Sequence, residues 1–335
     1  MSGKLAPLIG HDQTTARLWM AARRQTLHHA YLFEGPAGVG KRTVALRLAM
    51  MANCEAEPQL RPCASCPTCS QIATGNHPDV VMLSPDPSSA TPRIAVDAVR
   101  EVVRQVGYHR YNARHRFLIV EPAEALPPPS ANALLKTLEE PPDGTSFVLI
   151  ATHASALLPT IVSRCQRVRF SAVPEAELVP WLQARGVPHP ERAARLSLGC
   201  PGHALELADH LEARAATIDD LMQALRGDTP AVLEWASVVT TGARRDSTQE
   251  LLNRVELVED LLRDVVIVGS ESREPLLNAD REELVRAWTR LLWPAGVTRC
   301  HDLLERARAQ LQVNVQAKLV AEALMLGLRY ELRGR

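Results

Sequence analysis

The chain has 335 residues, and its 38 basic and 38 acidic side chains give a formal net charge of zero at neutral pH. Its 46% hydrophobic and 23% charged residues exclude a disordered or collagen-like chain, and the length favours two or three domains. The zero net charge argues against a protein that mainly grips phosphates, and the 4% of aromatic residues is too low for a stacking platform for single-stranded nucleic acid.

The first half of the chain alternates short apolar runs with helical periods, which is typical of an α/β domain. Residues 30–33, 117–120 and 147–150 are predicted to be buried strands. A glycine-rich turn and a helix follow the first of these strands. A second helix, capped by Ser130, is expected to end before the proline pair at 141–142.

The strand signal ends near residue 170, after a short strand in which Val168 and Phe170 alternate with arginines. Residues 175–212 are expected to form a few short helices, because prolines and glycines interrupt them. From about residue 213 the chain is predicted to be a helical bundle. Its apolar stripes are Leu251, Val255, Val258 and Leu262, and then Leu304, Ala307 and Leu311.

The glycine-rich turn at 35–41 has the setting of a phosphate-binding loop, because it follows a predicted strand and opens a helix. Gly35, Gly38 and Gly40 would let backbone N–H groups converge on a phosphate. Lys41 would then reach the outer phosphates. This pattern predicts a P-loop fold.

The positions that organise Mg²⁺ in an active P-loop site are altered here. A Ser or Thr should follow the lysine, but Arg42 stands there, and Thr43 lies about 100° further around the helix. The second predicted strand leads into Glu121 and Pro122, where an active site carries two acids. We therefore expect a nucleotide fold with weak or absent binding of ATP or ADP and no hydrolysis, and a working ATPase is the alternative.

Four of the seven cysteines cluster in the sequence, as Cys54, Cys63, Cys66 and Cys69. The two C-x2-C steps bring three sulfurs together in a turn, and the eight-residue loop can return the fourth to a tetrahedral zinc site. The alternatives are four unrelated core thiols or a redox pair. The insert has no room for a recognition helix, so a structural zinc is expected.

The sequence contains no predicted targeting or membrane segment. Residues 1–7 lack the apolar region of a signal peptide. The longest uncharged stretch, residues 146–163, is shorter than the roughly 20 apolar residues of a spanning helix. A cytoplasmic protein is expected, and a reducing compartment favours metal binding over disulfides for the clustered cysteines.

Several short motifs occur in a fixed order along the first half of the chain. They are residues 29–36 (HAYLFEGP), the four cysteines, His77-Pro78-Asp79, residues 131–142 (ANALLKTLEEPP) and Ser163-Arg164-Cys165. Over about residues 9–170 this order resembles bacterial clamp-loader subunits, the AAA+ subunits of the DNA polymerase III holoenzyme. The resemblance implies an AAA+ P-loop domain over 1–170 with a zinc module at 54–69, a helical lid over 171–212 and a helical oligomerisation collar over 213–335.

The resembling family comprises an ATP-hydrolysing motor subunit, called gamma or tau, and a non-hydrolysing subunit called delta-prime. The motor carries a lid arginine that has no counterpart in the matching stretch 199–205, where Gly202 stands. With Arg42 and Pro122, this makes three departures that resemble delta-prime, and the chain also lacks the long extension of tau. The alternative is the motor subunit.

Partners and single-residue roles are also implied by the resemblance. The implied partners are gamma or tau and delta subunits in a hetero-oligomer, with the sliding clamp and primed DNA reached through the complex and no membrane. Arg164 is implied to be an arginine finger for ATP bound by a neighbouring subunit, and a surface ion pair is the alternative. The implied degenerate nucleotide site comprises Gly35, Gly38, Gly40, Lys41, Arg42, Thr43, Glu121 and Thr152.

The expected function is therefore a stator that helps open the sliding clamp and load it onto primed DNA. A self-sufficient ATPase is the second hypothesis. A sequence-specific zinc DNA-binding protein is the third, and the absence of a basic helix beside the cysteines counts against it. No carboxylate constellation of a polymerase is visible, so any polymerase activity would belong to the holoenzyme.

Overall fold

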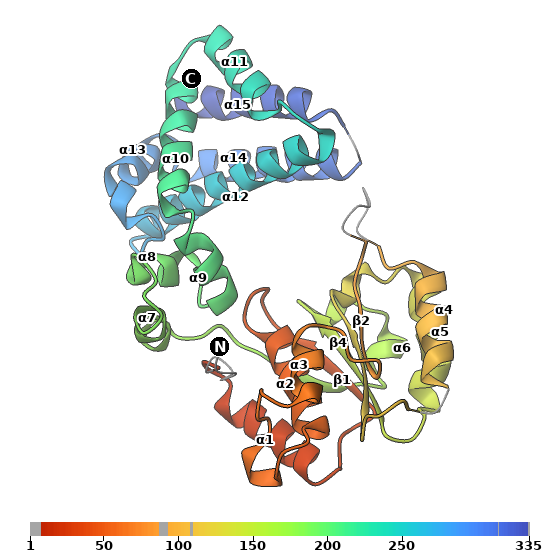
Figure 1. Cartoon of the computed structure of the whole chain (residues 1–335). Coiled ribbons are helices and arrows are strands. Elements are labelled where there is room, and N and C mark those ends of the chain that lie inside the picture. The colour runs from red at the N-terminus through yellow and green to blue at the C-terminus, as the bar shows by residue number, and fades with distance from the viewer. Residues whose placement is uncertain (1–7, 87–92, 108–109, 314, 334–335) are drawn as a thin grey trace. The chain divides into compact units, whose positions relative to one another are not determined.

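A computed structural model describes the chain except for residues 1–7, 87–92, 108–109, 314 and 334–335. The chain divides into two compact units, residues 1–206 and residues 207–335 (Figure 1). The division into three parts, with boundaries near 170 and 212, remains a prediction.

Within the described residues, the first unit is built on a five-stranded parallel sheet in the order β2-β3-β4-β1-β5. The strands are β1 (Ala30–Glu34), β2 (Val80–Leu83), β3 (Arg116–Val120), β4 (Thr145–Ala151) and β5 (Gln166–Arg169). The α/β expectation and its four strands are confirmed. The short edge strand β2 has no counterpart among the predicted elements, because a four-residue apolar run does not distinguish a strand from part of a helix.

Helices cover both faces of the sheet (Figure 1), and the strands supply side chains to two separate cores. Tyr31 and Phe33 point into the core under α1–α3, whereas Ala30 and Leu32 point into the core under α4–α6. This alternation explains why the first four residues of β1 are all apolar. The helices are α1 (Asp12–Arg23), α2 (Lys41–Asn53), α3 (Pro67–Ala73), α4 (Val96–Val106), α5 (Pro128–Glu139) and α6 (Pro159–Val162).

The start of α5 differs from the prediction. Ser130 lies inside the helix and not at its cap, because Pro128 and Pro129 occupy the first turn, where a missing N–H costs nothing. The buried Ser130 hydroxyl instead donates a hydrogen bond to the carbonyl oxygen of Ile94, at 2.8 Å. The helix ends at Glu139, before the proline pair, as expected.

Short helices follow the sheet, as predicted for residues 175–212. They are α7 (Glu175–Gln183), α8 (Pro190–Leu196) and α9 (Pro201–Ala208). Proline occupies the first position of α8 and of α9, where its fixed φ suits a helix start. The prolines therefore set the boundaries of these helices.

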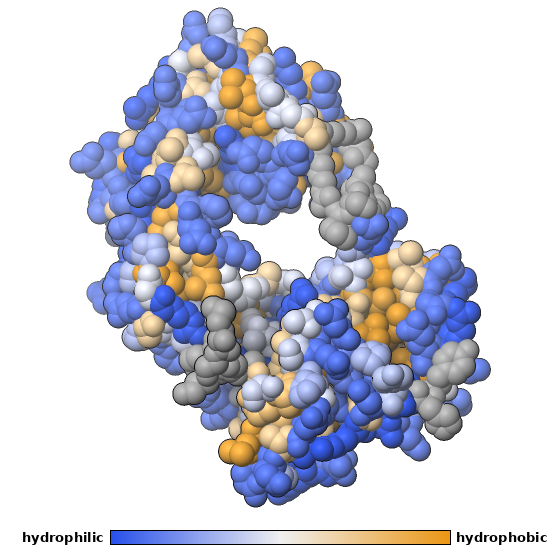
Figure 2. Space-filling model, in the orientation of Figure 1, coloured by the Kyte–Doolittle hydropathy of each residue, from blue (hydrophilic) through white to orange (hydrophobic). Residues whose placement is uncertain are grey.

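The second unit is helical throughout its described part. Its helices are α10 (Leu211–Arg226), α11 (Thr229–Val239), α12 (Arg244–Gly269), α13 (Glu282–Leu292), α14 (Ala295–Gln312) and α15 (Ala317–Arg333). The predicted stripes of α12 and α14 are buried in one core. Apolar side chains also remain exposed, and Figure 2 shows apolar areas among the hydrophilic side chains of these helices. Among the described residues, no helix has the length and hydropathy to cross a bilayer.

Candidate nucleotide site and metal centre

The glycine-rich loop leaves the carboxyl end of β1 and enters α2. Gly35, Gly38 and Gly40 all have positive φ, at 148°, 72° and 107°, which favours glycine. A Cβ on Gly35 would lie 2.1 Å from the carbonyl oxygen of Phe170, so no side chain fits there. The loop thus has the backbone form that presents N–H groups at a helix N-terminus to an anion.

Lys41 is the first residue of α2, and its side chain is buried at the loop. Its Nζ donates to the carbonyl oxygens of Gly35 and Pro36, at 2.5 and 2.6 Å. Burial lowers the pKa of Lys41, while the nearby Glu121 and Glu124 act in the opposite direction. The lysine therefore lies at the loop, with loop carbonyls as its partners.

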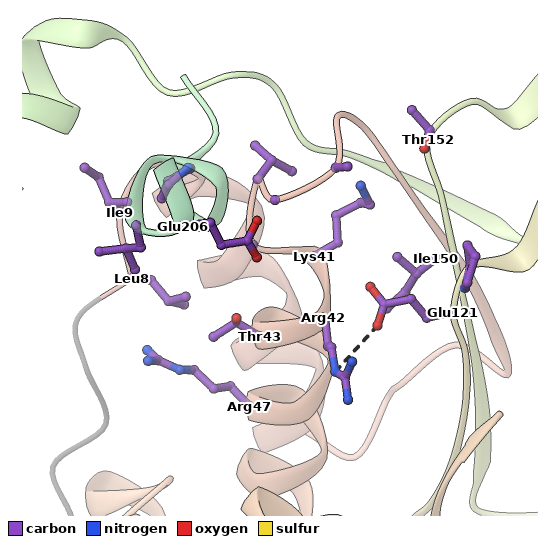
Figure 3. Close-up of a pocket in the computed structure, with 18 of the residues that line it drawn as sticks. Leu8, Ile9, Lys41, Arg42, Thr43, Arg47, Glu121, Ile150, Thr152 and Glu206 are labelled. Atoms are coloured by element: carbon purple, nitrogen blue, oxygen red, sulfur yellow. Dashed lines mark ion pairs between the residues drawn. The ribbon is translucent and has the colours of Figure 1, made fainter. Parts of the chain in front are cut away.

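A cavity of about 600 Å³ lies beside the loop, a size that suits a small-molecule ligand. Its lining includes the apolar Leu8, Ile9 and Leu205 as well as the loop, Lys41 and Glu121. Figure 3 shows Leu8 and Ile9 on one side of α2, near Glu206, and Lys41 and Glu121 on the other. Apolar side chains and the glycine-rich loop therefore line the same cavity.

The place where an active site holds Mg²⁺ contains an ion pair. Arg42 Nε lies 3.6 Å from Glu121 Oε2, whereas Thr43 points to the opposite side of α2 (Figure 3). Burial raises the pKa of Glu121, and the charges of Arg42 and Lys41 act against that rise. The residues present do not fit a magnesium site, because the hydroxyl ligand points away and the carboxylate faces a guanidinium.

Two further residues that the sequence analysis names, Gly202 and Thr152, also line the cavity. The Gly202 N–H donates to the Gly38 carbonyl oxygen at 2.8 Å, and a Cβ on Gly202 would lie 3.0 Å from that oxygen. Thr152 follows β4, where its N–H donates to Glu124 and its carbonyl oxygen accepts from Gly35 N at 3.2 Å. Thr152 thus contacts the loop through its backbone, which sequence reasoning does not indicate.

The four clustered cysteines come together in space. Cys54 follows the end of α2, Cys66 caps α3, and Cys69 lies in the first turn of α3. The four Sγ atoms all lie within 4.8 Å of one another. A tetrahedral zinc with Zn–S bonds of about 2.3 Å separates its sulfurs by about 3.8 Å. The structure therefore forms a possible metal site at these cysteines, and the four-thiolate donor set fits zinc.

Backbone N–H groups point at the sulfurs of this cluster. The N–H groups of Cys63, Cys66 and Cys69 donate to the Sγ atoms of Cys54, Cys63 and Cys66, at 3.4, 3.3 and 3.4 Å. Hydrogen bonds from the Ser65 side chain and backbone, with that of Cys66, lower the pKa of Cys63 to about 6. Burial raises the pKa values of Cys54 and Cys69. The turn therefore stabilises thiolate at its more open sulfur.

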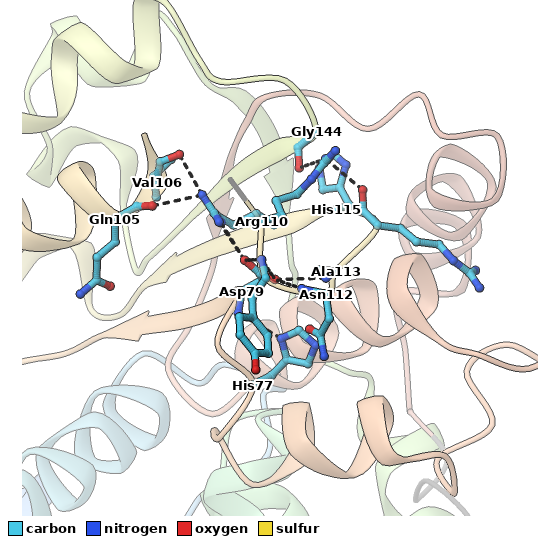
Figure 4. A network of polar contacts seen from close by, with 12 residues as sticks. His77, Asp79, Gln105, Val106, Arg110, Asn112, Ala113, His115 and Gly144 are labelled. Atoms are coloured by element: carbon cyan, nitrogen blue, oxygen red, sulfur yellow. Dashed lines mark hydrogen bonds and ion pairs between the residues drawn. The ribbon is translucent and has the colours of Figure 1, made fainter. Parts of the chain in front are cut away.

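A buried polar network explains the His77-Pro78-Asp79 motif. The Asp79 carboxylate accepts from the backbone N–H groups of residues 111–113, at 2.9 to 3.1 Å, and from Arg116 Nη2 at 2.8 Å. Figure 4 shows Asp79 facing this loop. Arg116 also donates to carbonyl oxygens at the end of α4. Asp79 therefore fixes the loop that leads into β3, a role that the motif alone does not reveal.

Arg164 is half-buried just after α6. Its guanidinium pairs with Glu139, at the end of α5, and donates to the Thr160 carbonyl oxygen at 2.8 Å. The two neighbouring arginines, Arg167 and Arg169, both pair with Glu34, at 2.7 Å. The arginine of the Ser-Arg-Cys motif is therefore held by a different element from the arginines of β5.

The comparisons with known proteins agree with the motifs. A family described as "DNA polymerase III, delta subunit" matches residues 10–174. The DNA polymerase III subunit delta' of Pseudomonas aeruginosa is 35% identical over 232 residues, covering 66% of this chain and 70% of that protein. The subunit tau of Bacillus subtilis is 34% identical over 172 residues, covering 51% of this chain and 30% of that protein.

A solved structure, a DNA polymerase III gamma subunit-related protein from Thermotoga maritima, covers 95% of this chain and 99% of its own, with 19% identity and a TM-score of 0.48. The family is established by the sequence relatives, since the chain covers more than two thirds of the delta' protein at 35% identity. The chain belongs to the AAA+ clamp-loader subunits of DNA polymerase III.

Proposed function

We propose that this chain is the delta-prime subunit, a non-hydrolysing stator that helps open the sliding clamp and load it onto primed DNA. The observation that carries the proposal is the Arg42–Glu121 ion pair at the place of Mg²⁺. Relatives named delta' and tau match the chain at similar identity, so overall similarity does not separate the two subunits. The altered site favours delta-prime, because phosphoryl transfer in P-loop proteins depends on Mg²⁺.

We also propose that Arg164 is an arginine finger for ATP held by a neighbouring subunit. A planar guanidinium with paired N–H donors can stabilise the charge that develops on transferred phosphoryl oxygens. In this chain the guanidinium pairs with Glu139 and donates to the Thr160 carbonyl oxygen, so a finger role requires that it exchange the Glu139 carboxylate for phosphate oxygens of the neighbouring ATP. A subunit without its own hydrolysis could thus still be required for hydrolysis next to it.

A structural zinc held by Cys54, Cys63, Cys66 and Cys69, and a hetero-oligomer with gamma or tau and delta subunits, complete the proposal. On α15, the exposed Leu319, Leu326 and Tyr330 lie at i, i+7 and i+11. They form a second apolar stripe, opposite the buried one, as expected for a helix with a partner on each side. This stripe supports the proposed collar over 213–335, and the proposed location is the bacterial cytoplasm, where replication takes place.

The stator and motor hypotheses predict different effects of Lys41→Ala on ATP turnover by the reconstituted clamp loader. We expect no measurable turnover by the isolated chain, and an unchanged rate for the complex that contains Lys41→Ala. Arg42→Thr should not restore turnover, because Pro122 still stands in the place of the second acid. Hydrolysis by the isolated chain that is lost in Lys41→Ala would instead establish that the chain is a motor subunit.

A further inference from the structure

The cavity beside the glycine-rich loop is lined by more basic than acidic side chains. Among the described residues, seven charged side chains line it: Lys41, Arg42, Arg47, Arg185, Glu121, Glu124 and Glu206. The basic groups outnumber the acidic ones before any ligand or metal is added. A polyphosphate entering this cavity would therefore meet compensating charge that belongs to the protein.

The Arg42 side chain starts in the first turn of α2, lines the cavity and reaches Glu121 at the end of β3, while 60% of it remains exposed. P-loop proteins bind Mg²⁺ in this place, and the ion requires near-octahedral oxygen ligands at about 2.0–2.1 Å. A magnesium ion here would have to separate Glu121 from Arg42 and then lie beside two cationic side chains, since Lys41 is also present. This position thus does not suit the metal, whereas the loop and Lys41 retain the features that hold phosphate.

We infer that the cavity binds a nucleoside di- or triphosphate without Mg²⁺, and that Arg42 supplies the counter-charge that the metal supplies elsewhere. Lys41 would exchange its bonds to the loop carbonyls for phosphate oxygens, while the base would lie against the apolar side chains of Leu8 and Ile9. A guanidinium pairs with phosphate through parallel N–H donors. It provides no metal coordination for hydrolysis, so the nucleotide would remain intact.

The inference rests on the proposed non-hydrolysing function and adds the class of ligand and its metal independence. Titration calorimetry of the full chain with ADP and with ATP, once in EDTA and once in MgCl₂, tests it. We expect wild-type affinity in EDTA to equal or exceed that in Mg²⁺. Arg42→Thr should weaken binding in EDTA about tenfold, the loss expected for one charge-assisted contact. Arg42→Lys, which keeps the charge, should retain most of the binding in EDTA.

Arg100→Thr is the matched control, because it removes an exposed arginine of α4 that does not line the cavity. It should leave both affinities unchanged. The inference is overturned if wild-type protein binds neither nucleotide at millimolar concentration, or binds only with Mg²⁺. Phosphate release measured in the same Mg²⁺ samples separates the two proposals. Turnover lost on Lys41→Ala would refute the stator, whereas Mg²⁺-dependent binding without turnover would refute only this inference.

Discussion

Asp79 shows how a single buried carboxylate can make the stability of the first unit depend on pH. Burial acts to raise its pKa, but the N–H groups of residues 111–113 and the Arg116 guanidinium outweigh burial and lower the pKa of Asp79 to about 2. A carboxyl group with a folded-state pKa below its unfolded value stabilises the fold above the unfolded pKa. That contribution is fully present above about pH 4 and is lost as pH falls toward 2.

We therefore expect the free energy of unfolding of the wild type to fall with acid more steeply than that of Asp79→Asn. The difference should reach about 2 kcal/mol between pH 7 and the lowest pH at which the protein remains folded, since one pKa unit corresponds to about 1.4 kcal/mol. Urea unfolding at a series of pH values measures it. Parallel pH profiles for the two proteins would show that Asp79 is not the group responsible.

Arg164 lies close in the sequence to Arg167 and Arg169 but pairs with a different glutamate. Arg164→Ala should leave folding, metal content and assembly intact, because its half-buried pair with Glu139 contributes little to stability. Hydrolysis at one partner site should slow by roughly 10³- to 10⁵-fold, as found when an arginine finger is missing. Single-turnover hydrolysis and clamp loading by the reconstituted complex are the measurements.

Arg167→Ala and Arg169→Ala are the controls for Arg164. Each leaves the other arginine paired with Glu34, so both should affect loading much less. Normal hydrolysis and normal loading by the complex with Arg164→Ala would contradict the role of Arg164 as a finger.

At the scale of secondary-structure elements, the proposed zinc site involves two helices of the first unit. Cys54 follows α2 directly and Cys69 belongs to α3, so a bound metal would connect the end of the phosphate-loop helix to the insert. Structural zinc binding has an apparent free energy of about 10–16 kcal/mol in model peptides. This is comparable with the whole stability of a domain, about 5–15 kcal/mol.

Protein purified without chelator should therefore contain one zinc per chain, and chelation should unfold at least residues 54–69. Metal analysis by mass spectrometry, followed by hydrogen exchange with and without chelator, measures both effects. Cys165→Ser is a control, since Cys165 lies outside the cluster and its loss should not change the zinc content. A zinc-free protein that shows the same exchange pattern would rule out the metal site.

The two compact units differ in how much of their structure can be read from local sequence. In the second unit, apolar stripes at helical spacing predict the buried faces of α12 and α14, because burial of one helix face follows the helical repeat. In the first unit, the buried strands are predicted by their apolar runs, but the short β2 is not. Its pairing with β3 forms only once the sheet assembles.

The glycine-rich loop, the set of four cysteines and the loss of the magnesium hydroxyl could be recognised before folding was considered, because each depends on residue types at short, fixed spacing. Which distant side chains meet depends instead on the assembled fold. It paired Asp79 with Arg116, 37 residues away, Arg42 with Glu121, and Arg164 with Glu139. Parallel strands bring like ends to one edge of the sheet. Arg42 and Glu121 therefore meet beyond the carboxyl ends of β1 and β3, whereas Asp79 and Arg116 meet at the amino ends of β2 and β3. No local pattern encodes such a meeting.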